Sequence, residues 1–298
     1  MNVGSALRLR ILAVGVVLIL AFVGAAAYDG WRLHQQLVTS NERELGNLAK
    51  ALAEEASRSL EAVDVVLRDT ADWYETTGRS LPEDSVQSAL NARAMGVTQV
   101  SVVTIVDAQG RQRLRSRQTG EPLADVSDRP YFQTQRDSPG AGLVINAPIV
   151  TRSERMASMV VSRRLNDRHG NFDGVVSAIV TLQHLQSAYS ALVLSEGSAL
   201  LLTLDDGTLV VRQPMIPGPD AIFKFPELAA LKGGALVDRA VSPMDGRIKL
   251  VAAVGVGHQP LILAMMRDEE RALAPWVDEM RSAIVRTVLL SLLVMLTI

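Results

Sequence analysis

A short stretch of the sequence, Ser127–Phe132, concentrates the side chains that are best suited to binding a small molecule. Asp128 and Arg129 place a carboxylate beside a guanidinium, and the aromatic rings of Tyr131 and Phe132 follow. A guanidinium binds a carboxylate through two parallel hydrogen bonds, and a tyrosine supplies a hydroxyl as well as an apolar wall. This combination predicts a pocket for a small organic anion.

The same stretch also has a purely structural interpretation. Pro130 is tolerated in the first turn of a helix, so we expect a short helix over 129–136, whose N-terminus would favour an anion. In the structural interpretation, Asp128 caps that helix, Arg129 pairs within the protein and Phe132 packs in the core. The residue types alone leave both interpretations open.

The sequence offers little support for other kinds of site. Its four histidines are isolated, without the spacing that zinc sites use, and it contains no cysteine, no phosphate-binding glycine loop and no nucleophile elbow. The formal net charge is −2, which argues against a nucleic-acid-binding surface. We therefore expect no catalytic residues, no metal, no cofactor and no nucleic-acid partner for this chain.

The N-terminal part of the chain predicts a membrane helix that continues as a long amphipathic helix. Ile11–Ala27 carries no charge, and Arg8 and Arg10 before it place the N-terminus in the cytoplasm. A helix over Trp31–Tyr74 would be about 65 Å long at 1.5 Å per residue. Its apolar side chains recur at steps of three and four, which predicts one buried stripe: Leu45, Leu48, Leu52, Ala56, Leu60, Val63 and Leu67. The small residues Ala25–Ala27 also fit a signal-peptidase site, so cleavage is an alternative.

The C-terminal part predicts a second membrane segment. A helix is expected to open at Asp268 and run toward the membrane, with a possible kink at Pro275. Thr287–Ile298 is uncharged to the last residue but covers only about 18 Å, which is too short for a bilayer core of about 30 Å. We interpret the chain as a fragment cut inside this second membrane helix.

Between the two apolar ends, turn residues and β-branched runs predict an α+β arrangement of two units. The first unit is expected to hold a helix over Asp84–Met95 that Gly96 closes, a hairpin, the short helix over 129–136, a run of antiparallel strands and a helix over Gln183–Leu192. The second unit is expected to hold two hairpins and a final strand, Leu261–Met266. The expected strands are Val97–Val106, Arg111–Ser116, Gly142–Val150, Met156–Arg164, Val175–Leu182, Ala199–Leu204, Thr208–Arg212, Ala235–Val241 and Arg247–Val254.

An ordered set of motifs over residues 40–270 resembles the double Cache (PDC-type) sensor domains of bacterial membrane receptors. The motifs are Leu60–Asp69, Ser127–Phe132, Val161–Leu165, Phe172–Val176 and Asp206–Arg212. The resemblance implies a long N-terminal helix followed by two PAS-like antiparallel-sheet modules. It also implies a C-terminal helix that enters the membrane.

The resemblance further implies a small-molecule pocket in the membrane-distal module. Its implied walls are Arg129, Tyr131 and Phe132 with Asp128, the strand around Ser101 and Thr104, and the strands near Asn146 and Ser162. The amino-acid-binding members have an Arg-x-Trp-Tyr element, whereas this sequence has Arg129–Phe132 as Arg-Pro-Tyr-Phe. A small carboxylate is therefore a better expectation than an amino acid.

We expect the chain to be a non-enzymatic sensor in the inner membrane, with residues 29–282 in the periplasm. It would pass ligand state to a missing cytoplasmic output domain, a diguanylate cyclase or histidine kinase, and form a homodimer through its long helices. The alternative is a membrane-tethered module that binds a periplasmic protein and no small ligand. The expected divisions are residues 1–28 (membrane helix), 29–75 (stalk helix), 76–192 (distal module), 193–267 (proximal module) and 268–298 (C-terminal helix).

Overall fold

The computed structural model describes residues 3–118, 122–146, 149–150, 157–181, 189, 195–214, 224–229 and 236–297. The helix expected at Gln183–Leu192 lies outside these residues, except for the helical Tyr189. The fold is α+β, with long helices and two antiparallel sheets. Packing divides the chain into two compact units, one of Met1–Asn47, Val237–Val251 and Arg267–Ile298, the other of Leu48–Leu236 and Ala252–Met266.

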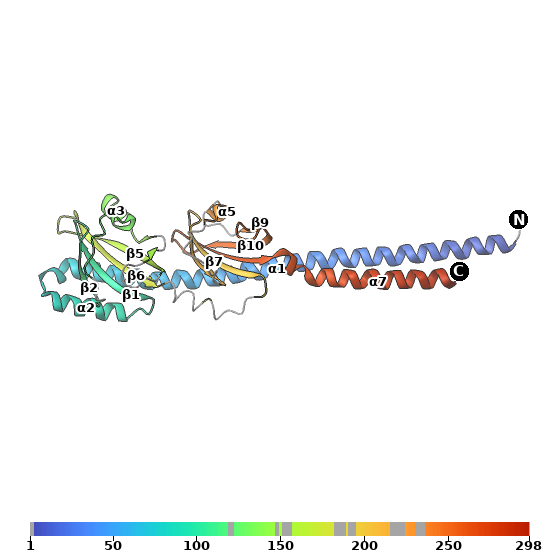
Figure 1. The fold of residues 1–298 in the computed structure, drawn as a ribbon, viewed down its shortest axis with the longest axis horizontal. Helices are drawn as coiled ribbons and strands as arrows, with labels where there is room; N and C mark the ends of the chain where they lie inside the picture. Colours follow the sequence, from blue (N-terminus) through green and yellow to red (C-terminus); the bar gives the residue numbers. More distant parts are fainter. Residues whose placement is uncertain are drawn as a thin grey trace. The chain divides into compact units, whose positions relative to one another are not determined.

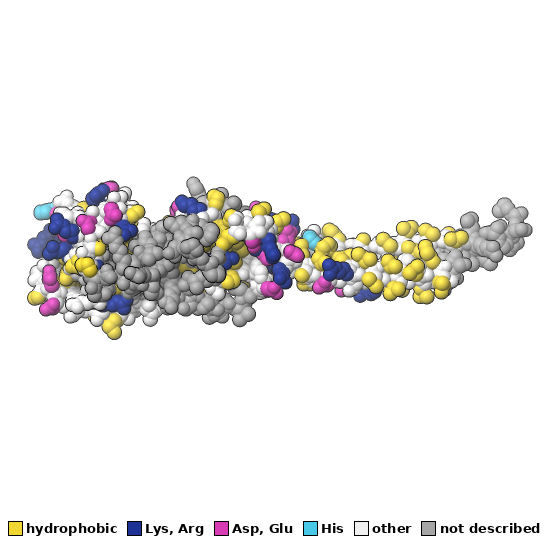
Figure 2. Space-filling view, in the orientation of Figure 1, with side chains coloured by type: hydrophobic (Ala, Val, Ile, Leu, Met, Phe, Trp, Pro, Cys, Tyr) yellow, Lys and Arg dark blue, Asp and Glu magenta, His cyan; other side chains and the backbone are white. Residues whose placement is uncertain are grey.

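A single helix, α1 (Val3–Thr76), covers both the apolar N-terminal segment and the expected stalk. Among the described residues it is the one helix long and apolar enough, from Leu12 onward, to cross a membrane. Apolar side chains cover much of the surface of the long helical part of the molecule (Figure 2). The exposed apolar side chains of α1 include those of Leu12, Val14, Val17 and Leu20. A second membrane helix at the C-terminus is not evident by the same criterion.

The buried stripe of α1 differs from the predicted one in its first half. Ala49 and Ala53 are buried, whereas Leu48 and Leu52 are only partly covered. The later positions, from Ala56 to Leu67, are buried as predicted. Size explains the difference, because small residues let neighbouring backbone approach a helix closely. Nearby, Gly257 has φ of +54°, which favours glycine, and a Cβ added there would lie 2.4 Å from Ser57 Oγ on α1.

The first sheet has the strand order β2-β1-β6-β5-β3, and β4 also pairs with β5. Its α3 helix lies on one face, while α1 and α2 lie on the other (Figure 1). The elements are η1 (Gly78–Ser80), α2 (Glu83–Met95), β1 (Val100–Asp107), β2 (Gln112–Arg115), α3 (Pro130–Asp137), β3 (Val144–Ile145), β4 (Ile149–Val150), β5 (Ala157–Asn166) and β6 (Phe172–Thr181). The expected helix end at Gly96 is confirmed, because Gly96 is the C-cap of α2.

The second sheet has the strand order β8-β7-β11-β10-β9. Its elements are β7 (Ser198–Leu204), β8 (Leu209–Gln213), α5 (Pro226–Ala229), β9 (Leu236–Val241), β10 (Ile248–Gly255) and β11 (Leu261–Asp268). The predicted turn between β7 and β8 is confirmed: the Asp206 carboxylate accepts a hydrogen bond from the Thr208 amide at 2.9 Å, and Gly207 has φ of +81°. Only glycine adopts that backbone conformation without strain.

The chain leaves the second sheet through two helices rather than the single one expected from Asp268. They are α6 (Glu269–Ala272) and α7 (Ala274–Thr297), separated at Leu273. The break follows from Pro275, whose ring would clash with the carbonyl four residues earlier in a continuous helix. In α7, the Trp276 indole N–H donates to the Gly30 carbonyl oxygen of α1 at 2.8 Å, so the two helices pack together.

Candidate ligand-binding site

The stretch that the sequence singled out forms the start of α3. The Asp125 carboxylate accepts hydrogen bonds from the Ser127 amide at 2.9 Å and its hydroxyl at 2.6 Å, which builds the turn before the helix. Arg129, in extended conformation, is the N-cap residue, and Pro130 is the first helical residue. The expected short helix is therefore confirmed.

Asp128 does not cap this helix, since the α3 N-cap shows no side-chain hydrogen bond. Its exposed carboxylate lies 3.9 Å from the Arg129 guanidinium, whose side chain is about a quarter exposed. This weak contact leaves the N–H groups of Arg129 largely available to another carboxylate. The structural interpretation is therefore wrong for Asp128.

The two aromatic residues turn inward and join a core cluster. Tyr131 and Phe132 pack with Val106, Val160 and Val175 from three strands of the first sheet. Burial raises the pKa of Tyr131 to about 12; the nearby charge of Arg129 lowers it and that of Asp128 raises it, so this phenol stays neutral at ordinary pH. Phe132 meets Phe172 edge to face, with 5.5 Å between ring centroids. The packing expected of Phe132 is confirmed.

A row of hydroxyl groups crosses the sheet beneath this cluster. Thr104 of β1 pairs with Ser177 of β6, which in turn pairs with Ser162 of β5. Directly paired residues of antiparallel strands point to the same face, and residues two apart along a strand do so as well. Because Val106, Val175 and Val160 contact α3, the hydroxyl row faces α3 too. All three hydroxyl-bearing residues are buried.

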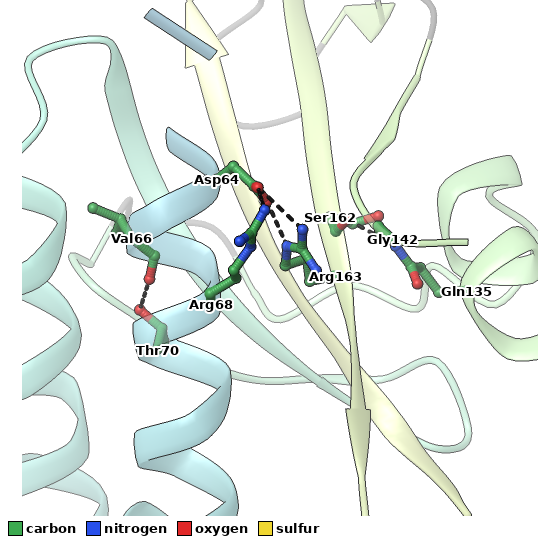
Figure 3. Close-up of polar contacts among 8 residues, drawn as sticks. All are labelled: Asp64, Val66, Arg68, Thr70, Gln135, Gly142, Ser162 and Arg163. Atoms are coloured by element: carbon green, nitrogen blue, oxygen red, sulfur yellow. Dashed lines mark hydrogen bonds and ion pairs between the residues drawn. The ribbon is translucent and has the colours of Figure 1, made fainter. Parts of the chain in front are cut away.

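Gln135 of α3 lies over the end of this row. Its side-chain amide donates to the Ser162 carbonyl oxygen at 2.8 Å and to the Gly142 carbonyl oxygen at 2.9 Å (Figure 3). Its own Oε1 is buried, as is Ser162 Oγ, and neither atom has a hydrogen-bond partner among the described residues. Two unpaired buried polar atoms on neighbouring residues are costly in a finished core, but they suit a site that a ligand completes.

The expected site residues fall into three groups. Thr104 and Ser162 lie on the face of the sheet that α3 covers, and Tyr131 and Phe132 of α3 pack against that face. Arg129 and Asp128 lie at the start of α3. Asn146, just after β3, donates its backbone amide to the Val160 carbonyl oxygen at 2.9 Å. Ser101 sits at a register shift in β1, outside the row, and its hydroxyl accepts a hydrogen bond from Arg117 at 2.7 Å.

Sequence reasoning missed Gln135 and Ser177. Gln135 follows Tyr131 by four residues and Phe132 by three, so helical spacing alone places all three on one face of α3. That spacing was the available signal for Gln135. Ser177 had no comparable signal, because its place in the row depends on the register between β1, β6 and β5.

The hollow between α1 and α7 is a different feature. It has a volume of about 420 Å³, and Gly30, Met280 and Arg286 are among its lining residues. A Cβ added to Gly30 would lie 2.3 Å from the Met280 sulfur, so the two helices already pack closely there. Its other walls combine apolar side chains, such as Phe22, Leu33 and Leu290, with charged ones, such as Asp29, Arg32 and Glu279.

Among the described residues, no group of three or more histidine, aspartate or glutamate side chains could hold a metal ion. The side chains that face one another between α3 and the first sheet include the hydroxyl row and the Gln135 amide, with Arg129 at the start of the helix, and such groups recognise organic ligands through hydrogen bonds.

Comparison with known proteins agrees with this architecture. A family model described as a Cache domain, of the double type, matches residues 32–276. The extracellular domain of rpHK1S-Z16, described as a histidine kinase, has a TM-score of 0.71 and 30% identity, over 80% of this chain and 99% of that one. No curated protein matches significantly.

Two ligand-bound structures share the fold at lower identity. The ligand-binding domain of the Pseudomonas fluorescens chemoreceptor CtaA, in complex with L-leucine, has a TM-score of 0.61 and 17% identity, over 80% of this chain and 99% of that one. The ligand-binding domain of Mlp24 with asparagine has a TM-score of 0.61 and 18% identity, over 81% and 98%. The chain therefore belongs to the Cache family and is a double Cache extracytoplasmic sensor domain.

Proposed function

We propose that this chain is the sensor part of a bacterial inner-membrane receptor and binds a small ligand between α3 and the first sheet. The observation that carries the proposal is the pair of buried atoms without hydrogen-bond partners, Ser162 Oγ and Gln135 Oε1. A ligand that hydrogen-bonds both atoms would recover free energy that the empty site forgoes. This gain in free energy would favour the conformation that binds the ligand, which is how a ligand shifts a receptor between two states.

The ligand we propose is a small carboxylate with a hydrogen-bond donor at its other end. Arg129, which is only weakly held by Asp128, would bind the carboxylate, and Tyr131 would form an apolar wall. Gln135 Oε1 is an acceptor and therefore requires a donor such as a hydroxyl or amine. The leucine and asparagine bound by CtaA and Mlp24 have both groups.

The membrane arrangement is part of the proposal. Residues 1–28 would cross the inner membrane, 29–282 would be periplasmic, and α7 would re-enter the bilayer near its end. Support for α7 comes from its exposed apolar side chains, Ile284, Val285, Leu289, Leu293 and Met295 (Figure 2). Residues 76–192 and 193–267 would form the distal and proximal modules between the stalk, 29–75, and the C-terminal segment, 268–298.

Ligand state would pass along α1 and α7 to a cytoplasmic diguanylate cyclase or histidine kinase. A homodimer through α1 would suit this role. Leu48 and Leu52, four residues apart and only partly covered, give one side of the helix apolar surface for a second copy. Such surface on a long helix commonly packs against another helix.

A melting screen of the detergent-solubilised chain against small carboxylates, amino acids, amines and sugars tests the binding proposal. We expect a carboxylate to raise the melting temperature, and Arg129→Ala to abolish the rise without lowering the melting temperature of the ligand-free protein. Arg136→Ala is the matched control, because Arg136 lies on the same helix but is ion-paired to Asp137 at 2.7 Å. A stabilising carboxylate whose effect survives Arg129→Ala would contradict the site, and no hit in any class would favour a protein-interaction module.

A further inference from the structure

Three consecutive residues of β5 connect the candidate site to two different helices. Successive side chains of a strand point to opposite faces of the sheet. Ser162 and Arg164 therefore face α3, whereas Arg163 between them faces α1. Figure 3 shows this arrangement, with Gln135 on one side of β5 and Asp64 and Arg68 of α1 on the other.

On the α3 side, three hydrogen bonds join β5 to the helix, and a fourth joins the helix to Gly142 before β3. Arg164 donates to the carbonyl oxygens of Gln135 at 2.7 Å and Arg136 at 2.9 Å, at the C-terminal end of α3. The last carbonyl groups of a helix have no N–H partner within the helix, so a cationic side chain at the C-terminal end of α3 is stabilising. The Gln135 side chain bonds back to the Ser162 carbonyl and to Gly142. A displacement of α3 by a ligand would therefore displace β5.

On the α1 side, Arg163 forms a two-point ion pair with Asp64. Its Nη2 lies 3.0 Å from Asp64 Oδ2, and its Nε bonds Oδ1. The Asp64 side chain is 7% exposed and that of Arg163 is 21% exposed. Arg68 also bonds Asp64 but belongs to α1 itself, so it does not join the two elements.

Near the end of α1 the Glu75 carboxylate also accepts a hydrogen bond from the Asn166 amide of β5, at 2.6 Å, but the Arg163–Asp64 contact joins two charged side chains and differs in kind from the apolar packing around it. Leu60, Val63 and Leu67 are buried apolar side chains of the same helix face, and apolar contacts are non-directional and permit sliding. A guanidinium–carboxylate fork fixes both distance and orientation, and separating it would break two charge-assisted hydrogen bonds to the buried Asp64 carboxylate. Movement of β5 along or across α1 is therefore resisted at Asp64.

We propose that the Arg163–Asp64 ion pair is the positioning contact that transmits the state of the α3 site to α1. The path runs from α3 through Gln135 and Arg164 to β5, and from β5 through Arg163 to Asp64. The inference rests on the proposed function for the identity of the site, but its test needs no ligand. It assigns these residues a role in coupling rather than in ligand recognition.

Hydrogen exchange of the full chain in detergent micelles tests the coupling. Gln135→Leu keeps the side-chain volume approximately but removes both side-chain hydrogen bonds, the one to Ser162 of β5 and the one to Gly142. We expect it to speed amide exchange in the α1 segment 60–70 by about threefold or more. A threefold change corresponds to the lower end of the interaction free energies that coupled residues show. In an Asp64→Asn/Arg163→Met background, which leaves no unpaired buried charge, Gln135→Leu should produce no further change there.

Arg68→Met is the matched control, because it removes the other partner of Asp64 and leaves the bridge to β5 intact; the response to Gln135→Leu should persist. If the double background does not fold, Arg163→Lys replaces it, keeping the charge without the fork, and should reduce the response. Equal responses in wild type and in the background, or no response in wild type, would overturn the proposal. A failed ligand screen would overturn only the binding proposal, since the perturbation here is a substitution.

Discussion

Removing the hydroxyl of Ser162 should stabilise the ligand-free protein. Ser162 is fully buried, and its Oγ has no hydrogen-bond partner. A buried polar group without a partner costs about 1–3 kcal/mol of desolvation. Ser162→Ala removes that cost and loses only the packing of one oxygen atom, so we expect a gain of roughly 1–2 kcal/mol.

Ser116 provides the opposite case in the same sheet. It is also buried, but its Oγ accepts a hydrogen bond from the Val103 amide at 3.0 Å. Ser116→Ala leaves that buried N–H unpaired and should lower stability by roughly 1–2 kcal/mol. Both variants remove one hydroxyl group, so the difference between their stabilities reports whether that hydroxyl is hydrogen-bonded in the folded protein.

Thermal melting of both variants beside wild type measures the effect. At about 2–4 °C per kcal/mol for a protein of this size, Ser162→Ala should melt roughly 2–8 °C higher and Ser116→Ala lower by a similar amount. Ser162→Ala should also weaken ligand binding. That result would show that the protein keeps the destabilising hydroxyl because the ligand needs it. A lower melting temperature for Ser162→Ala would refute the reasoning, because the hydroxyl would then be satisfied within the protein.

Three further predictions concern the scaffold. Gly174→Ala should destabilise the first sheet by about 2 kcal/mol or more in urea unfolding, because Gly174 has φ of +138° and its added Cβ would lie 2.1 Å from the Val106 carbonyl oxygen. Arg267→Met should lower the free energy of unfolding by roughly 1–3 kcal/mol in the same assay, because it removes the guanidinium that bonds the Glu44 carboxylate at 2.8 and 3.0 Å. The Glu44 side chain is half exposed, so water limits this loss. Burial raises the pKa of Asp245, but hydrogen bonds from Lys249, the Arg247 amide and Ser242 outweigh it and lower the pKa to about 2. The ionised Asp245 therefore stabilises the folded protein above about pH 4, its pKa in the unfolded chain, and this stabilisation is lost as the pH falls toward 2. The urea midpoints at pH 5 and pH 3 should therefore differ less in Asp245→Asn than in wild type.

Local patterns in the sequence predicted most of the elements of the fold. Turn residues such as Gly207 and the cap at Gly96 act within a few positions of themselves, so their effect is readable without tertiary structure. The stripe of α1 was wrong at Leu48 and Leu52, because hydrophobicity favours leucine while close packing favours the alanines beside them. Which helix face is buried depends on the neighbouring elements as well as on the helix itself.

The candidate site was predictable only in its local part. The start of α3 was readable from Arg129 to Phe132 because its chemistry lies in consecutive residues. The hydroxyl row was not, because Ser177 and Ser162 meet through strand register, which a single sequence specifies weakly. The Arg163–Asp64 pair joins residues 99 positions apart, beyond any local pattern.

A structure of the chain bound to a ligand from the melting screen tests the central claim most directly. We predict that the ligand lies between α3 and the first sheet, with hydrogen bonds to Ser162 Oγ and Gln135 Oε1 and its carboxylate on the Arg129 guanidinium. A ligand seated instead against the second sheet, with those two atoms still unpaired, would contradict the account.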